Sequence, residues 1–167
     1  MMFHLILHAS LSSLFFGLFG VSWDAVDRKI ENEFPKVQFI STERLHGLRT
    51  EGRAAVRLFD VREAEEFSVS HLEGALNYSQ SADIAAAVPN KHQEIVVYCS
   101  VGYRSAAVAA ELVDLGYSNV KNLRHSIFEW AEKGLPLEGQ AGEEGKVHPY
   151  NRAWGVLIDS SMHQYPQ

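Results

Sequence analysis

Hydrophobic positions along the chain follow a helical period and a strand period in turn. After Ser22, four apolar residues recur at helical spacing, and Pro35 ends this amphipathic helix, which we expect within residues 22–36. Short strand patterns then alternate with helical patterns. The expected strands are Val37–Ile40, Ala55–Asp60, Ala75–Asn77, Ile95–Tyr98 and Val120–Leu123. We expect a short helix directly after Ser41. Four further helices are expected over Glu63–Phe67, Ala82–Val88, Arg104–Leu115 and Ile127–Lys133. This alternation indicates an α/β fold with a parallel sheet.

Two of these elements have the clearest patterns. Ile95–Tyr98 is an unbroken apolar run between polar residues, which is typical of a central strand covered on both faces. Arg104–Leu115 has one apolar and one acidic helical face, and Gly116 is expected to end it in a left-handed conformation. We therefore expect any site between these elements to rest on a rigid strand and a long helix.

The first 21 residues differ from the rest because none of them is charged. Leu11–Gly20 is similar to the apolar core of a secretory signal, and Gly20-Val21-Ser22 offers a cleavage site, although no Lys or Arg precedes the run. As a membrane anchor, Leu5–Val21 gives 17 residues, short of the roughly 20 that a bilayer needs. A mis-called start near Ser22 is the third interpretation. A genuine signal implies an exported or membrane-associated protein, and a mis-called start implies a cytoplasmic one.

Residues after the last expected helix divide into a linker and a tail. Gly139–Lys146 is polar and Gly-rich, whereas residues 147–167 are too apolar for a disordered tail and too short to fold alone. We expect this tail to pack on the domain, with His148 as a packed side chain rather than a catalytic one. The expected organisation is a segment over 1–21, a helix over 22–36, a domain over 37–139 and an extension over 140–167.

Composition narrows the function classes. The 167 residues carry 15 Lys and Arg against 21 Asp and Glu, and the net charge of −6 argues against a nucleic-acid partner. The single cysteine, Cys99, excludes an intrachain disulfide and a zinc site built from several thiolates. His4 and His8 have the spacing of metal ligands on a helix, but nothing nearby completes a site. We expect no metal and no cofactor, and contact with a membrane only if the first segment is retained.

The lone cysteine stands where chemistry is favoured. Cys99 follows the apolar strand and precedes the strongest helix, so unpaired backbone N–H groups converge near its sulfur and lower the pKa of the thiol. Gly102 allows the loop to bend, and the fork of donors on Arg104 suits an oxyanion. Taken alone, the segment also fits an inert buried cysteine with Arg104 at the surface.

A wider set of motifs favours a reactive Cys99 over an inert, buried one. Five blocks follow one another along the chain: Leu58–Glu63 with Glu66-Phe67, His71–Asn77, Tyr98–Ser105, Leu115–Tyr117 with Val120, and Trp130 with Gly134–Leu137. In these blocks the chain resembles the rhodanese-like (sulfurtransferase) domain family over residues 37–139. The resemblance implies a five-stranded parallel sheet flanked by helices on both faces. It also implies that Cys99 takes a sulfane sulfur from a small anionic donor such as thiosulfate, releases sulfite, and passes the sulfur to a thiol, cyanide or an acceptor protein.

Around this nucleophile we expect an anion-binding group and a supporting scaffold. Arg62 could add a second positive charge to the site or pair with Glu63 or Glu66. Asp60 is expected to accept loop N–H groups, His71 to bond to backbone, and Trp130 to pack in the core. The expected anion-binding residues are Ser100, Val101, Gly102, Tyr103, Arg104, Ser105 and Arg62.

The chain departs from the family after the fifth strand. The family often has a Gly-Gly pair where this chain has His125-Ser126, so the turn is expected to be remodelled or strained by about 1–3 kcal/mol. His125 would then border the site or lie in a solvent-exposed turn.

Alternative functions also follow from the resemblance. The fold hosts phosphatases and arsenate reductases, in which the loop between Cys and Arg is one residue longer than the four residues found here. The tighter loop favours a persulfide over a phosphate. A non-catalytic or sulfur-relay binding module is the remaining alternative, because it needs the same cysteine.

Overall fold

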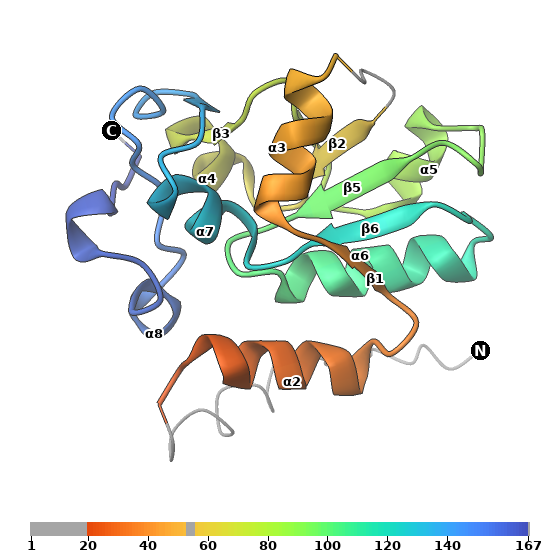
Figure 1. Cartoon of the computed structure of the whole chain (residues 1–167), viewed down its shortest axis with the longest axis horizontal. Helices are drawn as coiled ribbons and strands as arrows, with labels where there is room; N and C mark the ends of the chain where they lie inside the picture. The colour runs from red at the N-terminus through yellow and green to blue at the C-terminus, as the bar shows by residue number, and fades with distance from the viewer. Residues whose placement is uncertain (1–19, 53–55, 167) are drawn as a thin grey trace, which may run out of the picture.

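The computed structural model describes residues 20–52 and 56–166. The signal or anchor expected before Gly20, the two histidines within it, and Ala55 at the start of the second expected strand lie outside the described residues. Five parallel strands form the main sheet in the order β1-β6-β5-β2-β4, which confirms the predicted fold class (Figure 1). Their bounds are Gln38–Ile40 for β1, Arg57–Asp60 for β2, Leu76–Asn77 for β4, Ile95–Tyr98 for β5 and Val120–Leu123 for β6.

Helices cover both faces of this sheet. Figure 1 shows α6 on one side of the sheet and α3 on the other. The helices are α2 Trp23–Glu33, α3 Thr42–Thr50, α4 Ala64–Val69, α5 Ser81–Ala87, α6 Tyr103–Asp114, α7 Ser126–Glu132 and α8 Arg152–Gly155, with the 3-10 helix η1 at Ser160–Met162.

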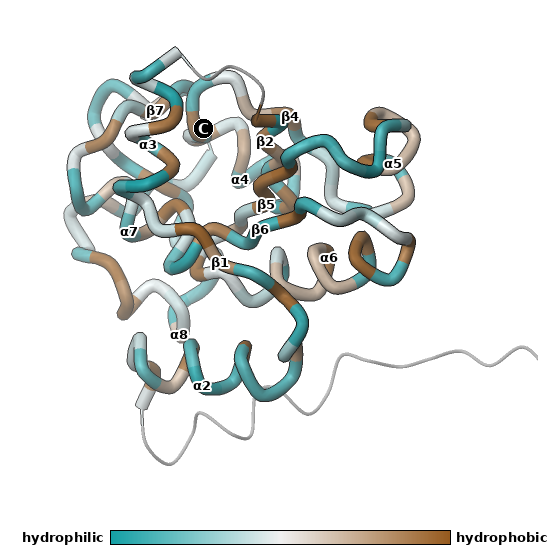
Figure 2. Tube along the Cα trace, turned by 45° about the vertical axis from the view of Figure 1, so that its right-hand side comes forward, coloured by the Kyte–Doolittle hydropathy of each residue, from teal (hydrophilic) through white to brown (hydrophobic). Residues whose placement is uncertain are grey.

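The central strand explains why its sequence is apolar throughout. Ile95 and Val97 on β5 are buried in one cluster with residues of α5 and α6, whereas Val96 and Tyr98 are buried in another with residues of α3 and α7. Alternate side chains of a strand point to opposite faces, so a strand covered on both sides needs apolar residues at every position. Figure 2 shows hydrophobic residues concentrated on the central strands β2 and β5, and mostly hydrophilic residues on α2.

The carboxyl ends of the central strands meet at one edge. In the register of the sheet, Asp60 at the end of β2 lies opposite Tyr98 at the end of β5 and Asn77 at the end of β4. Residues that follow these strands therefore lie side by side, which is where ligands bind in open parallel sheets.

The structure contains a second sheet of two short strands, which the sequence pattern did not predict. β3 (His71–Leu72) pairs with β7 (Leu137–Glu138) in antiparallel fashion. Two residues are too few to show a hydrophobic period, and the partners are far apart in the sequence.

The segments on either side of the α/β core pack against it. Val26 and Ile30 of α2 are buried in the cluster that also holds Val147, Leu157 and Ile158 of the C-terminal segment. The backbone of Val147 adds hydrogen bonds, donating to the carbonyl of Met162 at 2.8 Å and accepting from the N–H of Gln164 at 3.0 Å. In the described part of the chain, none of the helices has the length and apolar character required to span a membrane.

If the C-terminal segment is part of the cooperative core, truncating its buried side chains should destabilise the whole protein. Ile158→Ala should lower the free energy of unfolding by about 2–5 kcal/mol, because it leaves a cavity in the core. Val156→Ala, two residues away and 67% exposed, is the matched control and should change the free energy by less than about 0.5 kcal/mol. Urea denaturation followed by circular dichroism measures both. Equal, small effects would show that the segment is only loosely attached.

Candidate active site

The cysteine lies at the junction of the central strand and the longest helix. Cys99 is the first residue after β5, and α6 begins four residues later at Tyr103. Its side chain is buried, with 1% of the residue exposed. The Gly102 N–H donates to the Cys99 sulfur at 3.2 Å, and the Ser105 hydroxyl lies 3.5 Å from the same atom. The sulfur therefore accepts hydrogen bonds from the turn that begins the helix.

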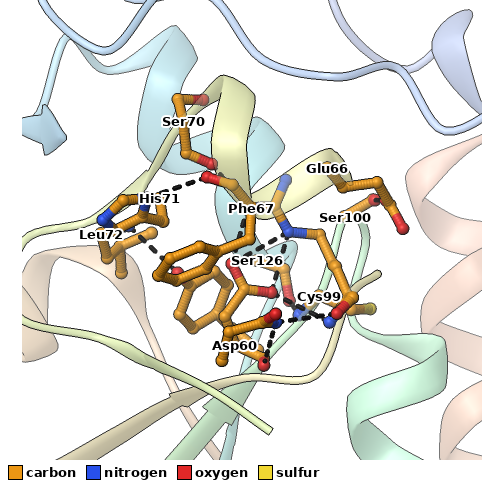
Figure 3. Close-up of polar contacts among 12 residues, drawn as sticks. Asp60, Glu66, Phe67, Ser70, His71, Leu72, Cys99, Ser100 and Ser126 are labelled. Atoms are coloured by element: carbon orange, nitrogen blue, oxygen red, sulfur yellow. Dashed lines mark hydrogen bonds and ion pairs between the residues drawn. The ribbon is translucent and has the colours of Figure 1, made fainter. Parts of the chain in front are cut away.

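The loop holds this geometry because α7 donates hydrogen bonds to two of its carbonyl groups. The first turn of α7 donates backbone N–H groups to the carbonyls of Cys99 and Ser100, from Ile127 and Phe128 at 3.2 Å each. The N–H of Cys99 donates to the Ser126 hydroxyl at 3.1 Å (Figure 3). Since these carbonyls point toward α7, N–H groups of the loop remain to face the sulfur.

Gly102 is the residue that lets the loop turn into the helix. Its φ of 105° lies in a region that side-chain-bearing residues rarely adopt. A Cβ there would also lie 3.5 Å from the Leu123 carbonyl oxygen and 3.6 Å from Ile30 of α2. The prediction that a glycine permits this bend is confirmed.

A buried asparagine side chain of β6 binds both the loop and the first turn of α6. Asn122, fully buried, donates its side-chain amide to the Gly102 carbonyl at 2.8 Å and accepts from the Ser105 hydroxyl at 2.7 Å. One side chain thus holds both groups that contact the Cys99 sulfur. Sequence reasoning missed Asn122, although a lone Asn between the buried residues of a short strand was the available signal.

The guanidinium of Arg104 is paired with a carboxylate of the same chain. Its two terminal nitrogens donate to the two oxygens of Glu66, each at 2.8 Å, and Nη2 also donates to the Ser100 hydroxyl at 3.0 Å. Figure 3 shows Glu66 close to Ser100. Such bidentate pairs are strong and directional. Sequence reasoning placed Arg104 in the site but did not identify Glu66 of α4 as its partner.

This arrangement favours the thiolate. Burial alone would raise the pKa of the Cys99 thiol, but the charge of Arg104 and hydrogen bonds from Ser105 and Gly102 outweigh it, so the pKa lies below its ordinary value. Burial would likewise raise the pKa of Glu66, whereas Arg104 and Arg62 hold it below the usual range. The carboxylate therefore stays charged and keeps Arg104 in place.

The structure corrects the expectations for Arg62. Its side chain is fully buried and pairs with Asp60 at 2.6 Å, not with Glu63 or Glu66, and it also donates to the Ser70 carbonyl at 2.6 Å. An arginine enclosed in this way supplies charge from a distance and does not line an open anion site. Asp60 accepts the Arg62 backbone N–H at 3.0 Å as well.

Two scaffold residues have the contacts expected of them. The His71 Nδ1 lies 2.9 Å from the carbonyl oxygen of Phe67, a contact drawn in Figure 3. Trp130 is 2% exposed and donates its indole N–H to the Pro136 carbonyl at 2.9 Å. Both side chains shape the domain around the site without contacting Cys99.

The remaining loop residues anchor the site to its surroundings. Val101 is buried in the hydrophobic cluster that contains α2 and α7. The Tyr103 hydroxyl donates to Glu33 of α2, and Lys29 of that helix lies 5.0 Å from the Tyr103 ring centroid. The side chains of Val101 and Tyr103 are therefore engaged with the core and with α2.

The turn at His125 and Ser126 has two consecutive residues in the left-handed region, and neither is a glycine. Their φ angles are 55° and 50°, as the prediction of a strained turn required. His125 is partly buried, with 17% of its side chain exposed: its Nε2 lies 3.2 Å from Asp27 and its Nδ1 3.1 Å from Glu129, and its ring centroid lies 4.3 Å from that of Trp23. The histidine therefore binds α2 to α7, while Ser126 supports the Cys99 loop.

Comparison with known proteins identifies the family of this chain. The family model of the rhodanese-like domain matches residues 41–133. The chain belongs to the rhodanese-like domain family. This rhodanese-like chain is 36% identical over 72 residues to the thiosulfate sulfurtransferase PspE of Escherichia coli, covering 41% of this chain and 69% of that protein. It is 34% identical over 88 residues to a sulfurtransferase of Allochromatium vinosum, covering 52% and 82%.

Solved structures show the same fold. A thiosulfate sulfurtransferase from Pseudomonas aeruginosa superposes with a TM-score of 0.61 at 21% identity, covering 70% of this rhodanese-like chain and 23% of that one. A Rhodopseudomonas palustris protein described as a possible tyrosine phosphatase superposes with a TM-score of 0.57 at 18% identity, covering 71% and 95%. At these identities the likeness is one of fold alone.

Within residues 20–52 and 56–166, no group of three or more His, Cys, Asp or Glu side chains could hold a metal ion.

The buried pair of Glu66 and Arg104 should make the stability of this rhodanese-like domain depend on pH. Because the folded-state pKa of Glu66 is lowered, its contribution is complete above the unfolded value of about 4.3 and is lost as pH falls through the folded value. Glu66→Gln should reduce the free energy of unfolding by about 1.5–3 kcal/mol at neutral pH. The difference from the wild type should shrink in acid.

Urea denaturation of both proteins at several pH values measures this difference. Glu73→Gln is the matched control, since Glu73 is an exposed carboxylate, and its curve should follow that of the wild type. A difference for Glu66→Gln that stays constant down to the acid limit would contradict a role for the charged carboxylate.

Proposed function

We propose that this rhodanese-like protein transfers a sulfane sulfur from thiosulfate or a similar donor to a thiol or cyanide through a persulfide on Cys99. The observation that carries the proposal is the sulfur of Cys99, which accepts a hydrogen bond from the Gly102 N–H, lies 3.5 Å from the Ser105 hydroxyl, and stands beside the charge of Arg104. A thiolate stabilised in this way is the nucleophile that sulfur transfer requires.

In the first half-reaction, the Cys99 thiolate attacks the outer sulfur of thiosulfate. A sulfur–sulfur bond forms to Cys99, the bond inside thiosulfate breaks, and sulfite leaves with its electron pair. The product is a Cys99 persulfide anion, and no external oxidant or reductant is used. Oriented N–H donors at the start of α6 would stabilise the negative charge of the persulfide.

In the second half-reaction, an external nucleophile completes the cycle. Cys99 is the only cysteine in the sequence, so no second thiol of the chain can resolve the persulfide to a disulfide. A thiolate or cyanide attacks the terminal sulfur, and the Cys99 thiolate leaves with the electron pair of the broken bond. The acceptor would be a small thiol, cyanide or the cysteine of an acceptor protein.

Loop size favours this reaction over phosphate ester hydrolysis. Only Ser100, Val101, Gly102 and Tyr103 separate Cys99 from Arg104, and the Gly102 N–H already contacts the sulfur at 3.2 Å. Arg104, which would have to hold phosphate oxygens, is instead bound at both terminal nitrogens to Glu66. The site therefore suits one additional sulfur atom better than a tetrahedral phosphate.

Incubation with thiosulfate should convert Cys99 to a persulfide. Intact-mass spectrometry of the full chain should show one added sulfur atom, and Cys99→Ser, which keeps the size of the side chain, should show none. A small aryl phosphate should not be hydrolysed by the same sample. Sulfur uptake from neither thiosulfate nor a small persulfide would contradict the proposal, and rapid phosphate release would favour a phosphatase instead.

Sulfite should appear in a single burst when no acceptor is present. Because the first product leaves before the acceptor binds, the burst should equal the enzyme concentration, and continuous release should begin only when cyanide or a thiol is added. Quenched-flow measurement of sulfite tests this. A burst without turnover on any small acceptor would indicate a relay module that delivers sulfur to a protein. Continuous release without acceptor would contradict the two-step scheme.

A further inference from the structure

The C-terminal segment reaches the active site from outside the family domain. The family match ends at residue 133, whereas the segment from Val147 to Gln164 returns to the core and pairs with itself through backbone hydrogen bonds. Its start is fixed because Val147 is fully buried. A short turn after Val147 then carries Tyr150 to α6.

This turn has an unusual conformation that several hydrogen bonds maintain. Tyr150 has a φ of 64°, a left-handed value that is strained for an aromatic residue. Its backbone N–H donates to the Nδ1 of His148 at 3.0 Å. The Asn151 side chain accepts the N–H groups of Ala153 and Trp154 and so begins α8 directly after the turn. The position of the Tyr150 backbone is therefore set from both sides.

The turn places the Tyr150 ring on the guanidinium of Arg104. The Arg104 Cζ lies 4.3 Å from the ring centroid, well within the range of a cation–π contact. Glu66 and Ser100 accept hydrogen bonds from the guanidinium, and the Tyr150 ring packs against the same group. With Tyr150 in place the Arg104 side chain is 28% exposed, and the ring at 4.3 Å excludes water from the side of the guanidinium that it contacts.

We propose that Tyr150 is a positioning residue for the nucleophile: its ring excludes water from one side of Arg104 and so keeps that charge in place and less hydrated next to the Cys99 loop. Charges interact more strongly where water is excluded. Because Arg104 is the charged group that lowers the pKa of Cys99, hydration of Arg104 would weaken its effect on the thiolate. The inference rests on the proposed function only in taking Cys99 as the nucleophile.

The other titratable groups near Arg104 and Tyr150 lie on or next to α4 and in the C-terminal segment. Glu66 on α4 binds Arg104 directly, and the charges of Glu66, Glu65, Arg62 and Arg104 act on His148. In the tail, burial lowers the pKa of His148, which leaves the neutral ring able to accept the Tyr150 N–H at neutral pH. None of these groups is altered by a substitution of the Tyr150 side chain.

The test compares the pH dependence of Cys99 alkylation in three variants of the full chain. Because Cys99 is the only cysteine, iodoacetamide reports on it alone. In Tyr150→Ala the midpoint of the rate profile should move to higher pH, and the rate at neutral pH should fall about two- to fivefold. The limiting rate at high pH should not fall. Tyr150→Phe, which keeps the ring, should restore the wild-type profile, and Val156→Ala in the same segment should not change it.

Each other outcome overturns the inference. An unchanged midpoint in Tyr150→Ala would show that Arg104 needs no cover, and a higher limiting rate with an unchanged midpoint would show that Tyr150 only blocks access to Cys99. If Tyr150→Ala does not fold, as circular dichroism would show, Tyr150→Leu replaces it under the same criteria. Alkylation requires no sulfur transfer, so failure of wild-type persulfide formation would contradict the proposed function and leave this test intact.

Discussion

Two backbone hydrogen bonds from the first turn of α7, to the carbonyls of Cys99 and Ser100, are the contacts on which the active-site loop depends. They draw carbonyl oxygens away from the sulfur, where they would repel a thiolate. The Gly102 N–H is then free to donate to the sulfur. Ser126 supports the same loop from the start of α7, so the turn after β6 and the loop after β5 form a single structure.

The charges of the site are arranged to favour one anion and to tolerate few others. Arg104 pairs with Glu66, and the more deeply buried Arg62 pairs with Asp60, so both cations are largely compensated. A compensated arginine still lowers the pKa of a nearby thiol, but it attracts a free dianion less than an unpaired one would. The site therefore stabilises the charge on the protein's own sulfur more directly than the charge on a donor.

The sequence reveals local features of this site better than the long-range ones. The bounds of β5 and β6 agree with prediction: Ile95–Tyr98 is a bounded apolar run, and Val120–Leu123 is a short segment with an apolar residue at each end. The loop also agrees, since Cys99 and Gly102 are close in sequence to the helix that they begin. Asn122 and Glu66 could not be placed in this way, because each contacts the loop from an element at least 17 residues away. Such contacts depend on strand order, which no local pattern specifies.

Both flanking segments act on the same end of one helix. Tyr103 and Arg104 are the first two residues of α6; Glu33 of α2 binds the first, and Tyr150 of the C-terminal segment covers the second. Donors at a helix start must converge on one atom, so a small displacement there weakens every bond to the sulfur at once. Changes in α2 or in the tail would therefore reach Cys99 through these two residues, and the segments outside the family match belong to the environment of the nucleophile.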